Sequence, residues 1–387
     1  MSPNRTETGT RSATGTGPVR LLLIGPYPPP HGGISVHVAT VEKLLLRSGT
    51  RCVVLDAGGH RPANGKASLR SRLAILKRVR RHARNGWTLH LHVSGHGPKS
   101  WLLALACGLA GRRSPGRVLT VHSGLVPEYL DSGVPGARTL ARIALRRWDR
   151  VLCVSPAVRD AVARLGVDPG RLEMVPAHLP APAVERDLPA DLARWRAAHA
   201  PVLSTALFFR PEYGFDVLLA ALERLKPAHP GLGCLVMGSG EDEDQARRAV
   251  RERGMADQVL LTGDVPHELC RTLIARSDVF VRPTLADGDA LSVREALALG
   301  VPVVASDAGN RPPGTVLFAR GDSEDLAARI EEVLQRPVEP HLEAASEPPE
   351  ESAIERLIRT YREITGEITR EIAPGELEPC GGTCSRS

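Results

Sequence analysis

The residues that decide the fold are 19–47, VRLLLIGPYPPPHGGISVHVATVEKLLLR. An apolar run over 19–24 stops at a rigid proline loop, and Gly32 and Gly33 follow that loop. From Ile34 to Arg47, apolar residues recur at helical spacing. A buried strand, a glycine-containing loop and a helix open a βαβ unit, so this stretch predicts the start of a parallel sheet.

The same alternation continues along the chain. In the first half, short apolar runs separated by helical segments predict strands at 52–55, 88–93, 118–122 and 151–154. The pattern stops at a proline cluster, Pro176 to Pro189, and restarts with predicted strands at 202–208, 233–237, 259–262, 279–282 and 301–305. We therefore expect an α/β protein of two Rossmann-like, doubly wound domains that face a central cleft. A last amphipathic helix, Ile354 to Ile368, is expected to pack back across the hinge.

The totals agree with a soluble protein of more than one domain. A chain of 387 residues with 42% hydrophobic and 24% charged residues is too long for one ordinary core. The expected divisions are a disordered leader at 1–18, an N-terminal domain at 19–180, a linker at 181–200, a C-terminal domain at 201–345, a crossing helix at 346–372 and a flexible tail at 373–387. We see no spanning helix and no secretory signal, and the seven scattered cysteines are typical of a reducing cytoplasm.

Charge is distributed unevenly between the two halves. Residues 1–180 hold 27 Lys and Arg against 9 Asp and Glu, a net charge of +18, whereas the remainder holds 23 against 35, a net charge of −12. Such an asymmetry predicts that the first half meets an anionic partner, which leaves open a membrane, a nucleic acid or an anionic substrate.

A second stretch, residues 281–309, VRPTLADGDALSVREALALGVPVVASDAG, is the most specific part of the sequence. It resembles the donor-binding signature of glycosyltransferase family 4, in which a proline-containing loop holds two acids eight positions apart and the second acid lies on a helix. The resemblance extends to the runs 25–33, 238–241, 261–267 and 321–326, so it covers most of the chain from 19 to 335. It implies the GT-B fold, with an N-terminal acceptor domain and a C-terminal donor domain.

The resemblance also implies roles for individual residues. Glu295 would hold the ribose hydroxyls of a nucleotide-sugar donor, and Asp287 would hold sugar hydroxyls and bias the developing oxocarbenium charge. Gly288 would let the sugar approach the backbone closely. The backbone amides of Leu291 and Ser292, at a helix N-terminus, suit a diphosphate. Alternatively, the acids belong to a solvated loop and an ordinary helix. Donor-binding positions are also expected at Gly263 and Glu295.

Two departures from the family pattern stand out. The family usually carries Glu where this chain has Asp287, which is one methylene shorter. It also places an Arg and a Lys where this chain has Phe209 and Tyr213. Arg210, one residue away, is a candidate for a bidentate phosphate contact, with a plain surface arginine as the alternative. Arg282 and Arg311 are further candidates by location alone.

The first half supplies three more candidates. Gly32 and Gly33, at the head of a helix, form the matching phosphate-side loop, or else a simple turn. His122 ends a predicted strand where the family keeps a histidine near the reactive face of the sugar; a core or capping histidine is the alternative. The remaining group, His90, His92 and His96, suggests a metal site, because alternation puts the first two on one face of a strand. No carboxylate cluster accompanies it and the family works without a metal, so we expect no metal cofactor.

The basic stretch from Leu69 to Arg84 carries apolar residues at helical spacing. It is either a solvated helix face over a core stripe or, through Arg70 to Arg84, a contact with an anionic membrane surface. A nucleic-acid partner is not expected, because aromatic residues make up only 3% of the chain and no recognised motif is present.

These observations favour a retaining, metal-independent glycosyltransferase. It would move a sugar from a nucleoside-diphosphate-sugar to a saccharide or lipid-linked hydroxyl acceptor, in the synthesis of cell-surface polysaccharide or glycolipid. We expect it in the cytoplasm, peripheral at the inner face of the plasma membrane. Two alternatives remain: a catalytically degenerate homologue that acts as a binding partner, and a nucleotide-sugar epimerase.

Overall fold

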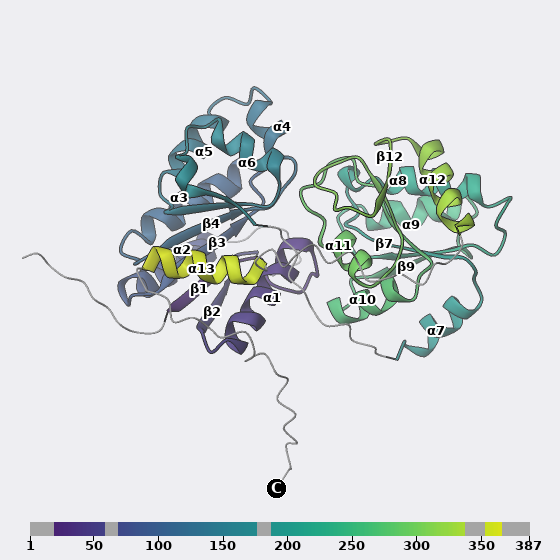
Figure 1. Ribbon diagram of the computed structural model, residues 1–387, viewed down its shortest axis with the longest axis horizontal. Coiled ribbons are helices and arrows are strands. Elements are labelled where there is room, and N and C mark those ends of the chain that lie inside the picture. Colours follow the sequence, from purple (N-terminus) through teal and green to yellow (C-terminus); the bar gives the residue numbers. More distant parts are fainter. Residues whose placement is uncertain (1–18, 59–68, 176–186, 337–352, 366–387) are drawn as a thin grey trace, which may run out of the picture.

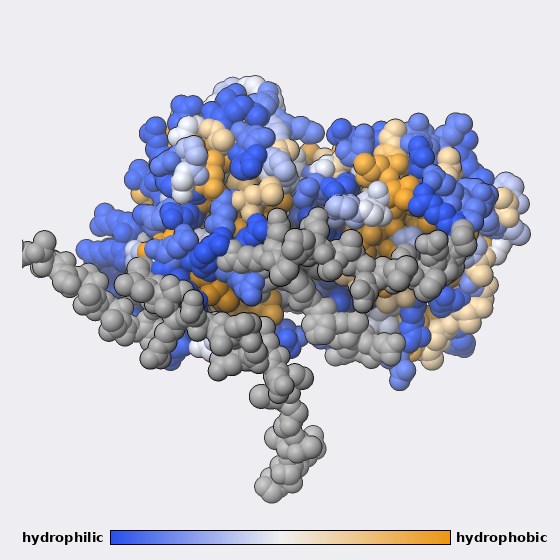
Figure 2. Space-filling model, viewed as in Figure 1, coloured by the Kyte–Doolittle hydropathy of each residue, from blue (hydrophilic) through white to orange (hydrophobic). Residues whose placement is uncertain are grey.

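The computed structural model describes residues 19–58, 69–175, 187–336 and 353–365. Two lobes lie side by side, each built on a parallel sheet with helices packed against it (Figure 1). On the face seen in Figure 2, hydrophilic residues cover much of both lobes, with hydrophobic patches among them, and a notch separates the lobes at the top of the view. In the part of the chain described, no helix combines the length and the apolar character needed to cross a membrane.

The N-terminal lobe contains, among the described residues, a sheet of six strands in the order β2-β1-β3-β4-β5-β6. Its strands are β1 Arg20–Gly25, β2 Arg51–Asp56, β3 Thr88–Val93, β4 Arg117–Val121, β5 Arg150–Cys153 and β6 Leu172–Met174. Its helices are α1 Gly33–Arg47, α2 Leu69–Arg84, α3 Pro98–Ala110, α4 Val126–Asp131, α5 Ala137–Leu145 and α6 Pro156–Ala163. Every residue of β3 is buried, as expected for a central strand covered on both faces.

The C-terminal lobe repeats this plan with the strand order β12-β11-β10-β7-β8-β9. Its strands are β7 Val202–Ala206, β8 Gly233–Met237, β9 Val259–Gly263, β10 Val279–Arg282, β11 Val303–Ser306 and β12 Thr315–Phe318. Its helices are α7 Ala190–Ala197, α8 Phe215–Leu225, α9 Glu243–Glu252, α10 His267–Ala275, α11 Leu291–Ala298 and α12 Ser323–Gln335. Helices α8, α9 and α12 contribute to the core on one face of the sheet, whereas α10 and α11 contribute to the core on the other.

The last described helix, α13 Ala353–Thr365, follows the C-terminal lobe in sequence and packs on the N-terminal sheet (Figure 1). Leu357 and Tyr361 are buried against strand residues of β1, β4 and β5. The Tyr361 hydroxyl also lies 2.6 Å from Nδ1 of His90 on β3. The predicted α/β architecture of two doubly wound domains with a helix that returns to the first is therefore confirmed.

The segment expected to be a linker, 181–200, differs from the expectation. Residues 190–197 form α7, and Leu188, Leu192 and Trp195 pack against the core of the C-terminal lobe. Leu192 and Trp195, three residues apart, lie on one face of α7, and Leu188 precedes the helix; together they supply the packing that a linker lacks. The linker prediction is wrong for this part, which is a peripheral helix of the C-terminal lobe. The predicted leader at 1–18 and tail at 373–387 lie outside the described residues.

Candidate active site

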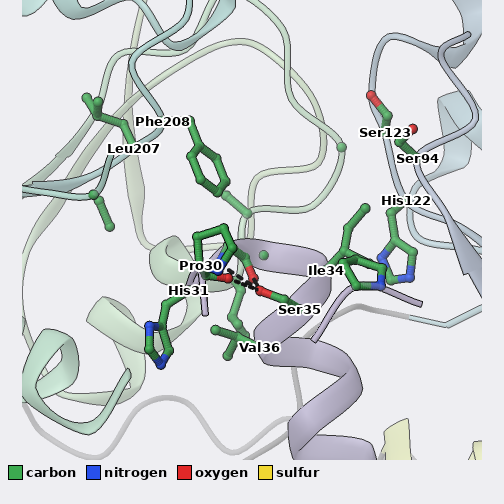
Figure 3. Close-up of a pocket in the computed structure, with 18 of the residues that line it drawn as sticks. Pro30, His31, Ile34, Ser35, Val36, Ser94, His122, Ser123, Leu207 and Phe208 are labelled. Atoms are coloured by element: carbon green, nitrogen blue, oxygen red, sulfur yellow. Dashed lines mark hydrogen bonds between the residues drawn. The ribbon is translucent and has the colours of Figure 1, made fainter. Parts of the chain in front are cut away.

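A cavity of about 590 Å³ lies between the two lobes. The loops that line it follow β1, β3 and β4 on one side and β7, β8, β9 and β10 on the other. These are the carboxyl ends of parallel strands, where ligand sites of open α/β sheets form. Figure 3 shows Pro30, His31 and Ser35 at the start of α1, with Phe208 reaching toward them from the C-terminal lobe.

The two lobes touch directly around this cavity. The His31 backbone N–H donates to Asp264 at 2.9 Å, and Nδ1 of the His31 ring lies 3.2 Å from the same carboxylate. A side chain at Gly32 would collide with the ring of Phe208, and one at Gly124 would collide with the backbone of Asp287. These glycines are therefore required by close approach between the lobes and not only by local turns.

Helix α11 brings three predicted residues to the cavity. Leu291 and Ser292 form its first turn, and the Ala290 N-cap makes no side-chain hydrogen bond, so backbone N–H groups of this turn are available to a ligand. Glu295 also lines the cavity and is only 5% exposed. Its Oε1 lies 2.6 Å from Nε2 of His267 and 3.6 Å from Nε of Arg271. The carboxylate is thereby held in a fixed position at the cavity wall.

Asp287 is held even more firmly. Its Oδ2 accepts hydrogen bonds from Arg282 at 2.9 Å, from Arg311 at 3.1 Å and from Thr284 at 3.2 Å. Burial alone would raise the pKa of the Asp287 carboxyl, but the two guanidinium groups outweigh this effect and lower the pKa. Asp287 is therefore ionised at neutral pH, with two buried arginines around it.

The residues in the family's phosphate-clamp positions have other roles. Phe209 is buried in the core against Phe215. Tyr213 covers a guanidinium instead, because Arg282 lies 5.2 Å from the centre of its ring. Arg282, from the end of β10, also donates to the carbonyl of Ala206 at 2.6 Å and lines the cavity. A cation from β10 thus lies beside the loop that follows β7, where the family places its clamp.

Arg210, the predicted replacement for that clamp, also lines the cavity. Its guanidinium lies 5.8 Å from the ring centre of Phe208 and 3.8 Å from the Glu241 carboxylate. Both contacts are with exposed or half-exposed groups, so Arg210 keeps the freedom to turn toward an anionic ligand.

On the N-terminal side, the cavity wall contains His92 and His122, whose Nδ1 and Nε2 atoms are 3.1 Å apart. Burial, followed by the neighbouring histidines, lowers the pKa of both imidazoles well below the usual range, so both are neutral at pH 7. His90 is fully buried beside them, and its two ring nitrogens form hydrogen bonds with Tyr361 and Thr120. Burial lowers its pKa to about 3.

Most of the predicted site residues meet at this one cavity. Its lining includes Gly32, Gly33, His122, Arg210, Asp287, Gly288, Leu291, Ser292 and Glu295. Gly263 is not among the lining residues that the structure describes; it ends β9 with a φ of 74°, and the next residue, Asp264, reaches the cavity. The sequence analysis missed Phe208, His31 and the His267 partner of Glu295. His31 and His267 both had a signal, because they lie in the runs 25–33 and 261–267 that resemble the family.

Two family descriptions match this chain. "Glycosyltransferase Family 4" matches residues 31–177, and "Glycosyl transferases group 1" matches residues 201–348. Together they cover both lobes, and the two six-stranded parallel sheets with the cavity between them define the GT-B class of glycosyltransferase. The chain belongs to glycosyltransferase family 4.

Among curated relatives, the chain is 32% identical over 225 residues to a GDP-mannose-dependent alpha-(1-6)-phosphatidylinositol monomannoside mannosyltransferase of Mycolicibacterium smegmatis, covering 54% of this chain and 57% of that protein. It is 25% identical to the gpi3 subunit of phosphatidylinositol N-acetylglucosaminyltransferase of Schizosaccharomyces pombe, covering 62% of this chain. The matched part spans 53% of the gpi3 subunit, so the chain aligns with about half the length of these relatives.

Solved structures agree on the fold. The Anabaena protein HepE, in complex with UDP and glucose, superposes with a TM-score of 0.60 at 16% identity, covering 90% of this chain and 97% of HepE. Sucrose-phosphate synthase from Thermosynechococcus elongatus gives a TM-score of 0.60 at 18% identity, covering 90% of this chain and 94% of the synthase. At these identities the likeness shows the GT-B fold alone.

Proposed function

We propose that this glycosyltransferase moves a sugar from a nucleoside-diphosphate-sugar to a hydroxyl acceptor, with retention of the anomeric configuration. The observation that carries the proposal is the position of Glu295. Its fixed carboxylate and the first turn of α11 line the same cavity as Gly32 and Gly33, at the start of α1 in the other lobe. Two helix N-termini with a carboxylate between the lobes suit a nucleoside diphosphate, because the amides bind the phosphates and the carboxylate accepts from ribose hydroxyls.

Stabilisation of the leaving diphosphate would come from arginines on the C-terminal side. Arg282 and Arg311 are held around Asp287, and Arg210 lies at the cavity wall. Fixed positive charge in a partly dry site stabilises charge that develops in the transition state without further reorganisation. We infer that these arginines replace the Arg and Lys of the family pattern.

The sugar itself would lie between Asp287 and His122. The close approach of Gly124 and Gly288 brings the loops after β4 and β10 together at this point. A neutral His122 can accept from or donate to a sugar hydroxyl, and Asp287 accepts only. The acceptor hydroxyl would attack from the face that the diphosphate leaves, while closure of the lobes excludes competing water.

A basic patch on the N-terminal lobe supports an acceptor at an anionic membrane surface. The pKa of Arg84 is lowered, first by the charge of Arg80 and also by Arg112 and Arg113, which shows that these four cations lie together. Arg80 and Arg84 lie on α2, whereas Arg112 and Arg113 follow the end of α3, and both helices expose apolar side chains: Leu73 at 50%, Leu102 at 54% and Leu109 at 48%. Exposed leucines beside arginines are typical of an interfacial surface.

We infer that the protein acts in the cytoplasm, at the inner face of the membrane, in glycolipid or cell-surface polysaccharide synthesis. We therefore expect co-sedimentation with vesicles that contain anionic lipid and not with zwitterionic vesicles. The variant Arg80→Glu/Arg84→Glu should lose co-sedimentation while it keeps nucleotide binding. Equal sedimentation of both proteins would contradict a role for the patch.

Transfer is tested with a panel of UDP- and GDP-sugars. Both bases belong in the panel, because one relative is named GDP-mannose-dependent and one solved neighbour holds UDP. We expect release of nucleoside diphosphate with one donor, an NMR spectrum of the product with the donor's anomeric configuration, and loss of turnover in Glu295→Gln. The exposed Glu252→Gln on α9 is the matched control and should stay active. An inverted product would contradict retention, and no turnover with any donor would favour a degenerate partner protein.

A further inference from the structure

The Asp287 carboxylate uses its hydrogen-bonding capacity on the protein itself. A carboxylate offers about four acceptor positions. Its Oδ2 accepts from Arg282 at 2.9 Å, from Arg311 at 3.1 Å and from Thr284 at 3.2 Å. Its Oδ1 accepts from the backbone N–H of Gly288, the next residue, at 3.0 Å, which keeps the carboxylate close to its own chain. Little capacity remains for a sugar hydroxyl, the role that the family resemblance implies for this position.

The two arginines around Asp287 differ in what else they contact. Arg311 donates from Nε to the Ser306 carbonyl at 3.0 Å, and its Nη2 lies 3.4 Å from the Ser306 hydroxyl. It is not among the described residues that line the cavity. Arg282 does line the cavity, and its bonds to Asp287 and to the Ala206 carbonyl leave part of its five N–H donors for a ligand. Arg311 therefore anchors the carboxylate from behind, and Arg282 is the arginine that a ligand can reach.

Arg282 also lies beside the position at which the family keeps a lysine. Tyr213 occupies that position, and the Arg282 guanidinium is 5.2 Å from the centre of its ring. Burial would lower the pKa of Arg282, but Asp287 and Tyr213 outweigh burial and raise it. Two guanidinium groups around one carboxylate form a group with a net positive charge. This charge suits an anionic part of the donor better than its neutral hydroxyls.

We propose that Asp287 is a positioning residue that fixes Arg282 against the diphosphate of the donor, and that Asp287 does not bind the donor's sugar. The inference rests on the proposed function, since it needs a nucleoside diphosphate at the start of α11. A guanidinium that is already fixed stabilises the departing diphosphate without reorganisation. The sugar lies beside this ion pair and does not depend on a hydrogen bond to Asp287. The family's acid position and its lysine position are thus coupled in this chain through Arg282.

Calorimetric titration of the purified protein distinguishes the two roles of Asp287. UDP is compared with UDP-glucose and GDP with GDP-mannose, because the free diphosphates carry no transferable sugar. We expect Asp287→Asn and Arg282→Ala to weaken both members of the binding pair by on the order of tenfold, with the ratio of their Kd values unchanged. Unchanged diphosphate affinity with weaker binding of the sugar nucleotide alone would overturn the proposal. The exposed Arg248→Ala on α9, outside the cavity lining, is the matched control and should bind as wild type does.

A gain of binding, which misfolding cannot produce, comes from returning the cation to the family's position. In Arg282→Ala/Tyr213→Lys, the lysine ammonium should lie near Asp287 and recover most of the diphosphate affinity that Arg282→Ala loses. Absence of recovery, in a double variant that circular dichroism shows to be folded, would overturn the coupling through Arg282. A wild type that binds neither UDP nor GDP would overturn the proposed function together with this inference. Wild-type binding that depends on Glu295 and not on Arg282 would overturn the inference alone.

Discussion

Across the cavity, the two lobes present different chemistry. The N-terminal wall offers the glycines of the α1 loop and the neutral imidazoles of His92 and His122, whereas the C-terminal wall offers Glu295 and the ion-paired Asp287. The C-terminal lining also includes Arg210 and Arg282, whose positive charges a diphosphate can engage, whereas the N-terminal lining combines the imidazoles and close backbone approach with Lys99. On the proposed function, the C-terminal lobe holds most of the charged leaving group and the N-terminal lobe shapes the space for sugar and acceptor.

The largest effect on stability is expected at the C-terminal wall of the cavity. Asp287→Ala leaves Arg282 and Arg311 buried without the carboxylate that joins them. Loss of one partner from a buried ion pair costs about 3–5 kcal/mol, which corresponds to a fall in Tm of about 10 °C. His122→Ala on the N-terminal wall should lower Tm by less, because a lost neutral hydrogen bond costs about 1–3 kcal/mol. If calorimetry gave equal falls in Tm for the two variants, the expected difference in stability between the two walls would be contradicted.

The second-largest effect is expected from a change at the contact between the two lobes. Gly124→Ala would place a Cβ against the backbone of Asp287, so the lobes cannot approach as closely. Misplacement of reacting groups by about 1 Å costs on the order of 10²-fold in rate, and we expect a loss of this size in kcat/KM. Small-angle scattering with bound nucleotide should show a more open molecule. Gly97→Ala, which meets no atom within 4 Å, is the matched control in the same lobe.

Acid should weaken the ion pairs of Asp287 in a defined pH range. Because the folded pKa of Asp287 is lowered, its ion pairs stabilise the fold fully above the unfolded pKa of about 3.8 and lose this contribution as pH falls through the folded value. Asp287→Asn removes this dependence. The difference in free energy of unfolding between wild type and Asp287→Asn should therefore be constant near neutral pH and shrink below about pH 3.8. A difference that shrinks already between pH 7 and 5 would assign the effect to another group.

The smallest effect is expected at the exposed contact between the lobes. His31→Ala removes a partly exposed pair with Asp264, and such pairs contribute about 0–1 kcal/mol. Tm should change by no more than about 3 °C, while KM for the donor rises modestly because the closed arrangement is less favoured. Titration of initial rates against donor concentration measures this. An unchanged KM would show that the His31 contact has no part in closure.

Much of the fold was predictable because local signals and tertiary packing agree. The predicted bounds of β8 and β10 match the structure, since each is a short, mostly apolar run between turn signals. Helix α7 was missed because its proline-rich surroundings resemble a linker. Its packing residues, such as Trp195, make sense only beside a sheet formed later in the chain.

The site was predictable where residues are close in sequence or belong to a recognised motif, as for Glu295 and the start of α11. Contacts between segments that are distant in the sequence could not be predicted. Arg311 reaches Asp287 across 24 positions. Strand alternation correctly placed His90 and His92 on one face, but it could not show that Tyr361 and Thr120 bind both ring nitrogens of His90, or that His37 and His122 pack beside His92.

The most direct test of the central claim is thermal stabilisation of the purified protein by nucleoside diphosphates. Binding at about 100 times Kd adds about 2.7 kcal/mol of stability, so a shift of several degrees is expected with UDP or GDP. Glu295→Gln should lose most of this shift and Glu252→Gln should retain it. No shift with any nucleoside diphosphate at millimolar concentration, or an equal shift in both variants, would contradict a donor site at the start of α11.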